Sequence, residues 1–261
     1  EGLAGLAHMV EHMVFKGAGG RDARAIAEAA DRDALAGVLG ALQRTGAGGA
    51  LGHYVDTDAK DSSRYLMHVS QSGIGLPDES YYRSDEYAEV REQYVAHIGR
   101  MFALAGVEAD PQVVFDLERK LAAHHWDVVK RRDAEKTYNL VTFDDLVGDN
   151  PGFEWNTWIA GLGASPAAFA EVVVRQPSFV REFAALWADE PLESWRAWLT
   201  WRAVHARAPY LTAAIVDENF AFYGRTLTGA EENRERWKRG VTLVQDLLGE
   251  AVGKLYVERH F

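Results

Sequence analysis

The chain of 261 residues is 48% hydrophobic and 26% charged, which is typical of a folded globular protein of one large domain or two small ones. Its formal net charge of −11 argues against a nucleic-acid partner, because phosphates require a basic surface. The absence of cysteine excludes disulfides, thiolate catalysis and cysteine-bound zinc, so any metal must be held by His, Asp or Glu.

Signals for membrane insertion or export are not visible. No apolar run reaches the ~20 residues that span a bilayer. The first residues also lack the charged and apolar regions of a signal peptide. The sequence therefore predicts a chain without a membrane segment and leaves its compartment open.

The first part of the chain has the composition and spacing of helices. Residues 1–16 form an apolar-rich stretch that a glycine cluster at 17–20 interrupts, and residues 21–30 are rich in alanine. Within 33–42, apolar residues at 35, 38, 39 and 42 follow the spacing of an amphipathic helix. Three successive helices are predicted here.

One clear β signal follows. Tyr54-Val55-Asp56 and Tyr65-Leu-Met-His-Val69 flank a polar turn at 58–63, and this arrangement predicts a β-hairpin over about residues 53–70. Beyond Tyr81 the chain reads as helical nearly to its end, with predicted helices at 84–105, 111–131, 142–147, 154–163, 166–172, 178–187, 193–207, 210–223, 230–249 and 250–259. The predicted fold class is mainly α: a multi-helix domain with one small β-hairpin.

One motif has the spacing of a metal site. His8-Met-Val-Glu11-His12 is an H-x-x-E-H motif, in which residues at i and i+4 of a helix present two imidazoles to one metal ion. Glu11 lies beside them and can deprotonate a metal-bound water. A working zinc site also needs a third protein ligand. The open candidates for it are Glu86, Glu89, Glu92, Asp56 and Asp58.

The residues around this motif resemble a known family. The string Gly5-Leu-Ala-His-Met-Val-Glu-His-Met-Val-Phe-Lys-Gly17, with the helix-like segment 21–28, is similar to the active-site helix of the pitrilysin/insulinase family. That resemblance implies that His8 and His12 bind zinc, that Glu11 is the catalytic base, and that Glu89 is the third ligand by its distance along the chain. Residues 1–29 are therefore expected to be a pitrilysin-like segment. The alternative is an orphaned helix that binds no metal.

A second resemblance covers nearly all of the remaining chain. The string Val55-Asp-Thr-Asp-Ala-Lys-Asp-Ser-Ser-Arg-Tyr65 resembles a hairpin of the neprilysin/endothelin-converting-enzyme family. Further similar strings follow in family order at 70–78, 81–82, 118–126, 131–139, 176–177, 195–199, 219–229, 236–238 and 249–258. Residues 30–261 are therefore expected to be an incomplete neprilysin-like N-terminal domain.

The second resemblance implies a zinc peptidase with two lobes. One lobe carries an H-E-x-x-H zinc site, and the other is helical and limits access to peptides. No histidine in this chain is followed by glutamate, so H-E-x-x-H is absent and no catalytic residue is transferred. The expected partners are peptide substrates and a zinc-bearing lobe C-terminal to Phe261, while substrate-binding residues stay unassigned.

Three functions follow as hypotheses. The first is the substrate-restricting helical lobe of a neprilysin-like zinc metalloendopeptidase, which by itself is expected to be inactive. The second is a self-contained H-x-x-E-H metallopeptidase that uses His8, Glu11 and His12. The third is a scaffold or binding remnant without catalytic activity.

Several other polar and aromatic residues have an ordinary structural interpretation and a functional one. The histidines at 124 and 125 are adjacent on a predicted helix and diverge by about 100°, so packing is favoured over a shared metal. His53 and His68 are placed on the hairpin, where they can face each other, although lone histidines are more often surface or hydrogen-bonded residues. Trp195, Trp198 and Trp201 are expected in the core, and the run 130–132 is expected on an exposed helix face. Arg131 and Arg225 are expected either in ion pairs or facing a substrate carboxylate.

Overall fold

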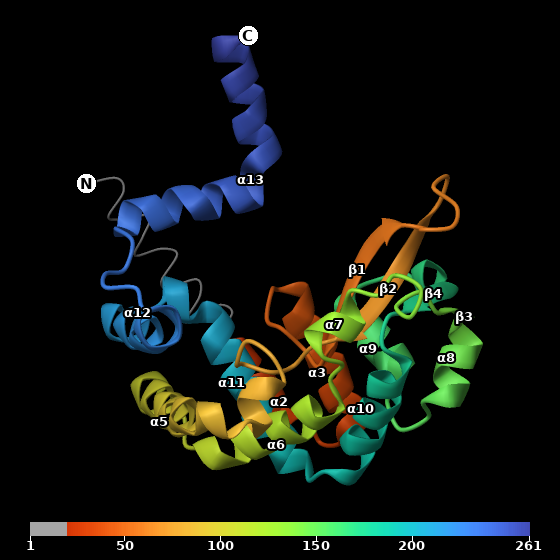
Figure 1. Ribbon diagram of the computed structural model, residues 1–261, viewed down its shortest axis with the longest axis horizontal. Coiled ribbons are helices and arrows are strands. Elements are labelled where there is room, and N and C mark those ends of the chain that lie inside the picture. The colour runs from red at the N-terminus through yellow and green to blue at the C-terminus, as the bar shows by residue number, and fades with distance from the viewer. Residues whose placement is uncertain (1–19) are drawn as a thin grey trace. The chain divides into compact units, whose positions relative to one another are not determined.

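The computed structural model describes residues 20–261, with side chains from residue 23 onward. The helix predicted for residues 1–16, which carries the H-x-x-E-H motif, lies outside the described residues. The chain divides into two compact units, of which the first ends at Asn219 and the second comprises Phe220–Phe261. Figure 1 traces the chain through both units.

Helices make up most of the first unit, which confirms the predicted mainly α class. The longer helices are α2 (Gly20–Glu28), α3 (Arg32–Arg44), α5 (Ala88–Ala105), α6 (Pro111–His124), α9 (Trp155–Leu162), α10 (Pro177–Asp189) and α11 (Leu192–Arg207). The shorter elements are α4 (Ser80–Arg83), α7 (Val128–Arg131), α8 (Phe143–Asp149), α12 (Ala213–Phe220), and the 3₁₀ turns η2 (Asp85–Tyr87), η3 (Pro166–Phe169) and η4 (Ala208–Tyr210).

Local sequence signals set the ends of several helices. The Asp31 carboxylate accepts a hydrogen bond from the Ala34 amide at 2.9 Å, which satisfies a free N–H at the start of α3. Asp110 does the same for α6 by accepting from the Gln112 amide at 2.8 Å. Gly106 ends α5 in the left-handed conformation, with φ of +67°, where glycine has no steric cost.

The predicted hairpin is present and belongs to a sheet of four strands. β1 (Leu51–Thr57) pairs antiparallel with β2 (Tyr65–Gln71), and β2 pairs in parallel with β4 (Glu171–Val174). β3 (Leu140–Thr142) joins β4 on its other side, which gives the strand order β1-β2-β4-β3. The hairpin is therefore anchored in the helical unit through a strand about 100 residues later in the chain (Figure 1).

The helix predicted for residues 166–172 is wrong. A 3₁₀ turn covers Pro166–Phe169, and the next residues form β4, whose three consecutive valines are almost completely buried. β-branched valines favour a strand, and their burial on both sides is the pattern of a central strand rather than of an amphipathic helix.

The single helix predicted for residues 111–131 is also wrong. Helix α6 ends at His124, and His125 has an extended backbone with φ of −66° and ψ of 138°. A new helix, α7, begins after Asp127, whose carboxylate accepts from the Lys130 amide at 2.8 Å. His124 and His125 therefore do not share a helix.

The core of the first unit is unusually aromatic. Six of the eight tryptophans are less than 2% exposed: Trp155, Trp158, Trp187, Trp195, Trp198 and Trp201. Neighbouring rings meet edge to face, as between Trp195 and Trp198, whose centroids lie 5.6 Å apart at 90°. The prediction that the tryptophans of 195–201 lie in the core is confirmed.

The second unit consists of a π-helical segment, η5 (Ala221–Thr226), and α13 (Arg236–His260). Leu248 has non-helical backbone angles that divide α13 into two pieces, close to the predicted break between residues 249 and 250. No residue of α13 is buried.

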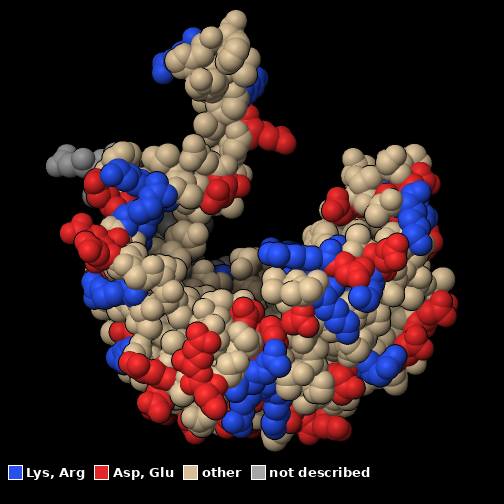
Figure 2. All heavy atoms as spheres, in the orientation of Figure 1, with Lys and Arg blue, Asp and Glu red and all other residues tan. Residues whose placement is uncertain are grey.

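Within residues 20–261, no helix combines the length and the apolar character needed to cross a bilayer. Acidic and basic side chains are interspersed over the first unit on the face drawn in Figure 2. The residues of 130–132 are exposed, as predicted for a solvated helix face.

Candidate functional site

The predicted metal site at His8, Glu11 and His12 stays a prediction. His8, Glu11 and His12 lie outside the described residues. Glu89 is exposed on α5, where its carboxylate accepts a hydrogen bond from the Gln93 side chain at 3.0 Å. Among residues 20–261, no group of three or more His, Asp or Glu side chains is arranged to hold a metal.

The other acidic candidates also have ordinary surroundings. Glu86, Glu92 and Asp56 are exposed. Asp58 is 2% exposed and accepts hydrogen bonds from Lys60, Arg64 and Tyr138, so its carboxylate stabilises the turn of the hairpin. The backbone hydrogen bond from Lys60 is the main cause that lowers the pKa of Asp58.

The two hairpin histidines do not face each other, so the structural interpretation holds over the paired one. His53 pairs across the ladder with Val69, and His68 pairs with Tyr54, so the two imidazoles point to opposite faces of the sheet. His68 stacks on Tyr54 with ring centroids 5.0 Å apart. Burial lowers the pKa of both histidines and so favours the neutral form of each imidazole. Both side chains therefore act as packing residues.

A better candidate site is built around the loop that follows β2. The loop belongs to neither a helix nor a strand, so its backbone groups must find side-chain partners. The Trp198 indole donates to the Gly73 carbonyl at 3.1 Å, and the Arg202 guanidinium donates to the Ile74 carbonyl at 3.3 Å. Helix α11 thus fixes the first half of this loop.

The second half of the loop is held by one buried hydroxyl. The Tyr82 hydroxyl accepts from the amides of Gly75 and Leu76, both at 3.0 Å, and donates to Glu118 Oε2 at 2.7 Å. Burial, followed by the charge of Glu118, raises the pKa of Tyr82, so this phenol keeps the proton that it donates.

Glu118 is the anchor of this network. Its side chain is fully buried, and Oε2 also accepts from the Tyr94 hydroxyl at 2.9 Å and from the Gly75 amide at 3.1 Å. Burial raises the pKa of the Glu118 carboxyl, while the charge of Arg202 and the hydrogen bonds oppose that shift. Among the described residues, Glu118 Oε1 has no hydrogen-bond partner.

The close packing around the loop requires glycine at position 75. A Cβ at Gly75 would lie 1.9 Å from the Tyr94 hydroxyl oxygen, a distance no side chain can adopt. Gly73 has φ of +97°, a conformation that L-residues disfavour. The loop therefore requires glycine at both positions, at Gly73 for its backbone angle and at Gly75 for the close approach of Tyr94.

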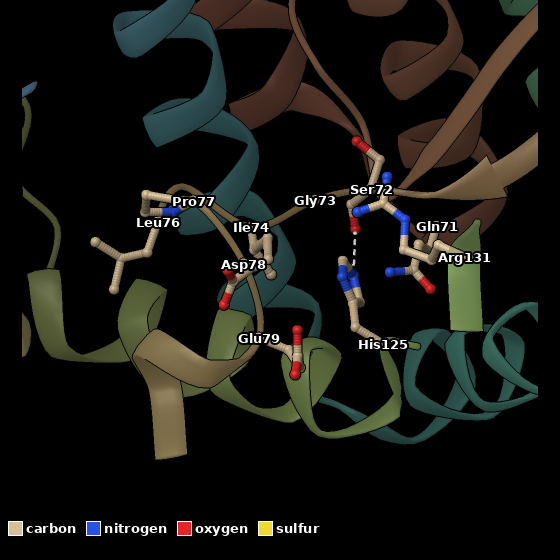
Figure 3. Close-up of a pocket in the computed structure, with 10 residues that line it drawn as sticks. All are labelled: Gln71, Ser72, Gly73, Ile74, Leu76, Pro77, Asp78, Glu79, His125 and Arg131. Atoms are coloured by element: carbon tan, nitrogen blue, oxygen red, sulfur yellow. Dashed lines mark hydrogen bonds between the residues drawn. The ribbon is translucent and has the colours of Figure 1, made fainter. Parts of the chain in front are cut away.

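A cavity of about 140 Å³ lies beside this loop, and we name it the loop cavity (Figure 3). Its walls come from the end of β2, the following loop, and the segment between α6 and the end of α7. It is lined by Gln71, Ser72, Gly73, Ile74, Leu76, Pro77, Asp78, Glu79, His125 and Arg131.

His125 forms one wall of the loop cavity. Its Nε2 donates to the Ser72 carbonyl at 3.1 Å, and its ring meets Phe179 edge to face with centroids 4.8 Å apart. Burial lowers the pKa of His125 to about 4, so the imidazole is neutral near pH 7. With the proton on Nε2, Nδ1 is an acceptor.

Comparison with known proteins identifies the family. The family model described as "Peptidase family M13" matches residues 8–261. The chain belongs to peptidase family M13. The match begins inside the segment that resembles pitrilysin, and the predicted boundary between residues 29 and 30 stays a prediction.

Solved structures of M13-like proteins share the fold. The zinc metalloprotease ZMP1 of Mycobacterium tuberculosis in an open state superposes with a TM-score of 0.92 and 51% identity, over 98% of this chain and 40% of that chain. An inhibitor complex of the same protease gives a TM-score of 0.90 and 54% identity, over 93% of this chain and 38% of that one. PEPO of Lactobacillus rhamnosis, at 18% identity and a TM-score of 0.76, shares the fold over 97% of this chain and 41% of that chain.

Curated M13 relatives are more distant in sequence. Endothelin-converting enzyme 1 of Cavia porcellus is 26% identical over 218 residues, which cover 80% of this chain and 29% of the relative. Neprilysin-3 of Drosophila melanogaster is 25% identical over 228 residues, with the same coverage. The chain therefore spans less than a third of the length of these relatives, and the predicted neprilysin-like N-terminal portion is confirmed.

Sequence reasoning missed the residues that fix the loop beside the loop cavity. Glu118 and Tyr82 lay inside strings that resemble the family, but no role was predicted for them. One signal was present: Glu118 falls on the apolar face of α6, in line with Val114 and Leu121. A carboxylate among core positions indicates a buried polar network.

Proposed function

We propose that this chain is the N-terminal helical portion of an M13 zinc metalloendopeptidase, and that it restricts access of substrates without holding the catalytic zinc. One observation carries the proposal: the chain matches 98% of its own length, but only 40% of the length of a zinc metalloprotease, at 51% identity. The 261 residues contain no H-E-x-x-H motif, and in this proposal the zinc ligands of that motif belong to a part of the protein outside these residues.

The physical properties of the first unit support a restricting role. A wall that excludes folded proteins must hold its shape, and interlocked aromatic rings give a close-packed core of low compressibility. Peptides are the substrate class that this role implies, and a zinc-bearing lobe C-terminal to Phe261 is the partner. In this proposal residues 30–261 are the neprilysin-like domain.

The described residues do not fit a zinc site, and we therefore route no catalytic step through a metal on this part of the chain. The H-x-x-E-H motif at residues 8–12 favours one alternative, a self-contained metallopeptidase. In that case His8 and His12 hold zinc, Glu11 is the base, and Glu89 is the third ligand.

A measurement of zinc content and peptide cleavage on the purified 261-residue chain separates the two functions. We expect less than 0.1 zinc per chain and no chelator-sensitive cleavage of a short fluorogenic peptide. His8→Ala should then change neither quantity, like the control His260→Ala, which removes an exposed histidine of α13.

The opposite result would establish the alternative. Stoichiometric zinc and chelator-sensitive cleavage, both lost in His8→Ala and kept in His260→Ala, would mean that the chain carries its own metal centre. Glu11→Gln would then abolish cleavage and retain zinc.

A further inference from the structure

We propose that the loop cavity binds a small zwitterion, namely an α-amino acid with both its ammonium and its carboxylate free. Such molecules are end products of peptide hydrolysis, so the ligand class agrees with the proposed function. The inference rests on the described residues alone, and binding by this chain can be tested without any peptidase activity.

The size of the loop cavity limits the ligand. A cavity of about 150 Å³ in another protein holds a molecule of benzene, which has six heavy atoms. The loop cavity has about 140 Å³. Alanine also has six heavy atoms, so an amino acid of that size fills the space, whereas a longer peptide must leave most of its length outside.

Arg131 supplies the group that recognises a carboxylate. Its guanidinium lines the loop cavity and lies beside Gln71 and Ser72 (Figure 3). Among the described residues, no acid pairs with Arg131 within 4.0 Å: nearby Asp133 pairs with Lys136 at 2.7 Å, and Glu79 pairs with Arg83 at 2.7 Å. A guanidinium without an acidic partner can offer a carboxylate two parallel N–H donors.

The groups that recognise an ammonium lie on the other side of His125. Figure 3 shows the carboxylates of Asp78 and Glu79 there. Asp78 uses Oδ1 to accept from the amide and hydroxyl of Ser80, which leaves Oδ2 for a ligand. Glu79, which is 8% exposed, pairs with Arg83 through Oε1 and retains Oε2.

The charge pattern selects a zwitterion over a simple ion. Glu79 and Arg83 neutralise each other, which leaves one positive charge at Arg131 and one negative charge at Asp78. An anion without an ammonium is repelled by Asp78, and a cation without a carboxylate is repelled by Arg131. Neutral His125, placed between these ends, adds an acceptor without adding charge.

The walls of the loop cavity are already ordered. The side-chain amide of Gln71 donates from Nε2 to the Trp126 carbonyl at 3.0 Å and accepts at Oε1 from the Trp126 backbone N–H at 2.8 Å. Neither polar atom of this side chain therefore needs to rearrange. The loop from Gly73 to Leu76 is fixed by α11 and Tyr82. A ligand therefore binds without the entropic cost of ordering a loop.

An NMR titration of the isotope-labelled 261-residue chain tests the proposal. Three probes distinguish recognition of the carboxylate from recognition of the ammonium. They are alanine, N-acetylalanine, which has only the carboxylate, and alanine amide, which has only the ammonium. The Trp126 amide and indole N–H report on the loop cavity. We expect alanine to bind at least 10-fold more tightly than either blocked compound.

Two arginine variants provide the matched comparison. Arg131→Gln should weaken alanine binding at least 10-fold, whereas Arg132→Gln, which removes an adjacent exposed charge that does not line the loop cavity, should leave it unchanged. Asp78→Asn should weaken alanine binding and leave N-acetylalanine no weaker than before. Unchanged amide spectra away from the site verify that each variant is folded.

Three results would overturn the proposal. Equal binding of alanine and N-acetylalanine would reduce the cavity to an anion site. Equal effects of Arg131→Gln and Arg132→Gln on alanine binding would mean that Arg131 does not contact the ligand. The absence of alanine-dependent shifts at saturating concentration would exclude the ligand class. None of these results depends on whether the chain or its relatives cleave peptides.

Discussion

Tryptophan has opposite environments in the two units of this protein. In the first unit six tryptophans are less than 2% exposed and interlock edge to face. In α13 of the second unit Trp237 is 63% exposed, and Leu247 and Leu255 are 72% and 66% exposed. Figure 2 shows that side chains other than Lys, Arg, Asp and Glu cover much of α13.

The contrast shows what an amphipathic pattern does and does not determine. Residues 237, 241 and 244 follow the spacing of an apolar helix face, and each is an exposed apolar residue in α13. The pattern predicts the helix correctly but does not supply the partner that covers its apolar face. Apolar faces of this kind mark interaction surfaces, and the lobe proposed to lie C-terminal to Phe261 is a suitable partner.

The largest expected effect compares one tryptophan from each region. Trp198→Ala should lower the free energy of unfolding by about 3–5 kcal/mol, because it empties a core position and removes the indole that holds the Gly73 carbonyl. Trp237→Ala should change it by less than about 0.5 kcal/mol, because its indole is mostly in solvent. Urea unfolding followed by circular dichroism measures both.

A large loss of stability in Trp237→Ala would contradict the comparison, because it would mean that the apolar face of α13 is buried within the chain itself. Equal, small effects of the two substitutions would instead show that the aromatic core tolerates a cavity of indole size.

Glycine-to-alanine substitutions give a second comparison, in which stability should fall in the first unit and rise in α13. Helices α3 and α9 cross so closely that a Cβ at Gly161 would lie 2.2 Å from the Gly37 carbonyl oxygen. Gly161→Ala should therefore destabilise the first unit by about 1–3 kcal/mol through overpacking. Gly253 in α13 has no atom within 4 Å of such a Cβ, and Gly253→Ala should increase helix stability by about 0.5–1 kcal/mol.

Thermal unfolding and the helical circular dichroism signal measure these two effects. A neutral Gly161→Ala would mean that the α3–α9 contact can open without cost. A destabilising Gly253→Ala would show that this position of α13 contacts another surface in solution.

The sequence predicted those elements whose signals are local. The apolar spacing at 35, 38, 39 and 42 indicated α3, and the two segments that flank the 58–63 turn indicated the hairpin. Strand β4 was missed because its pairing partners are Met67–Val69 and Leu140–Thr142, far away in the sequence, and a short valine run is equally compatible with a buried helix.

The loop cavity was beyond sequence reasoning for a similar physical reason. Its residues come from positions 71–74, 76–79, 125 and 131, and the side chains that fix the loop come from 82, 118, 198 and 202. None of these separations has a characteristic spacing. Arg131 was considered for a ligand carboxylate, but only the fold brings it to the same cavity as Asp78 and Glu79.

The last prediction concerns the stability contributed by the buried histidine of the loop cavity, His125, as the pH changes. Because burial lowers the pKa of His125 to about 4 from an ordinary value of 6.5, the unfolded chain binds a proton at this position below pH 6.5 and the folded chain only below about 4. Stability is therefore retained above pH 6.5 and lost as the pH falls toward 4. Between pH 7.5 and 5.5 the loss from this residue should be about 1 kcal/mol.

Urea unfolding at the two pH values measures this loss, and His125→Gln should remove it while keeping an N–H donor for the Ser72 carbonyl. The comparison uses the difference between the variant and the parent, which cancels the opposite contribution of Glu118, whose pKa burial raises. If His125→Gln and the parent lose equal stability on acidification, then the imidazole already opens to solvent in the folded protein, and the wall of the loop cavity is not rigid.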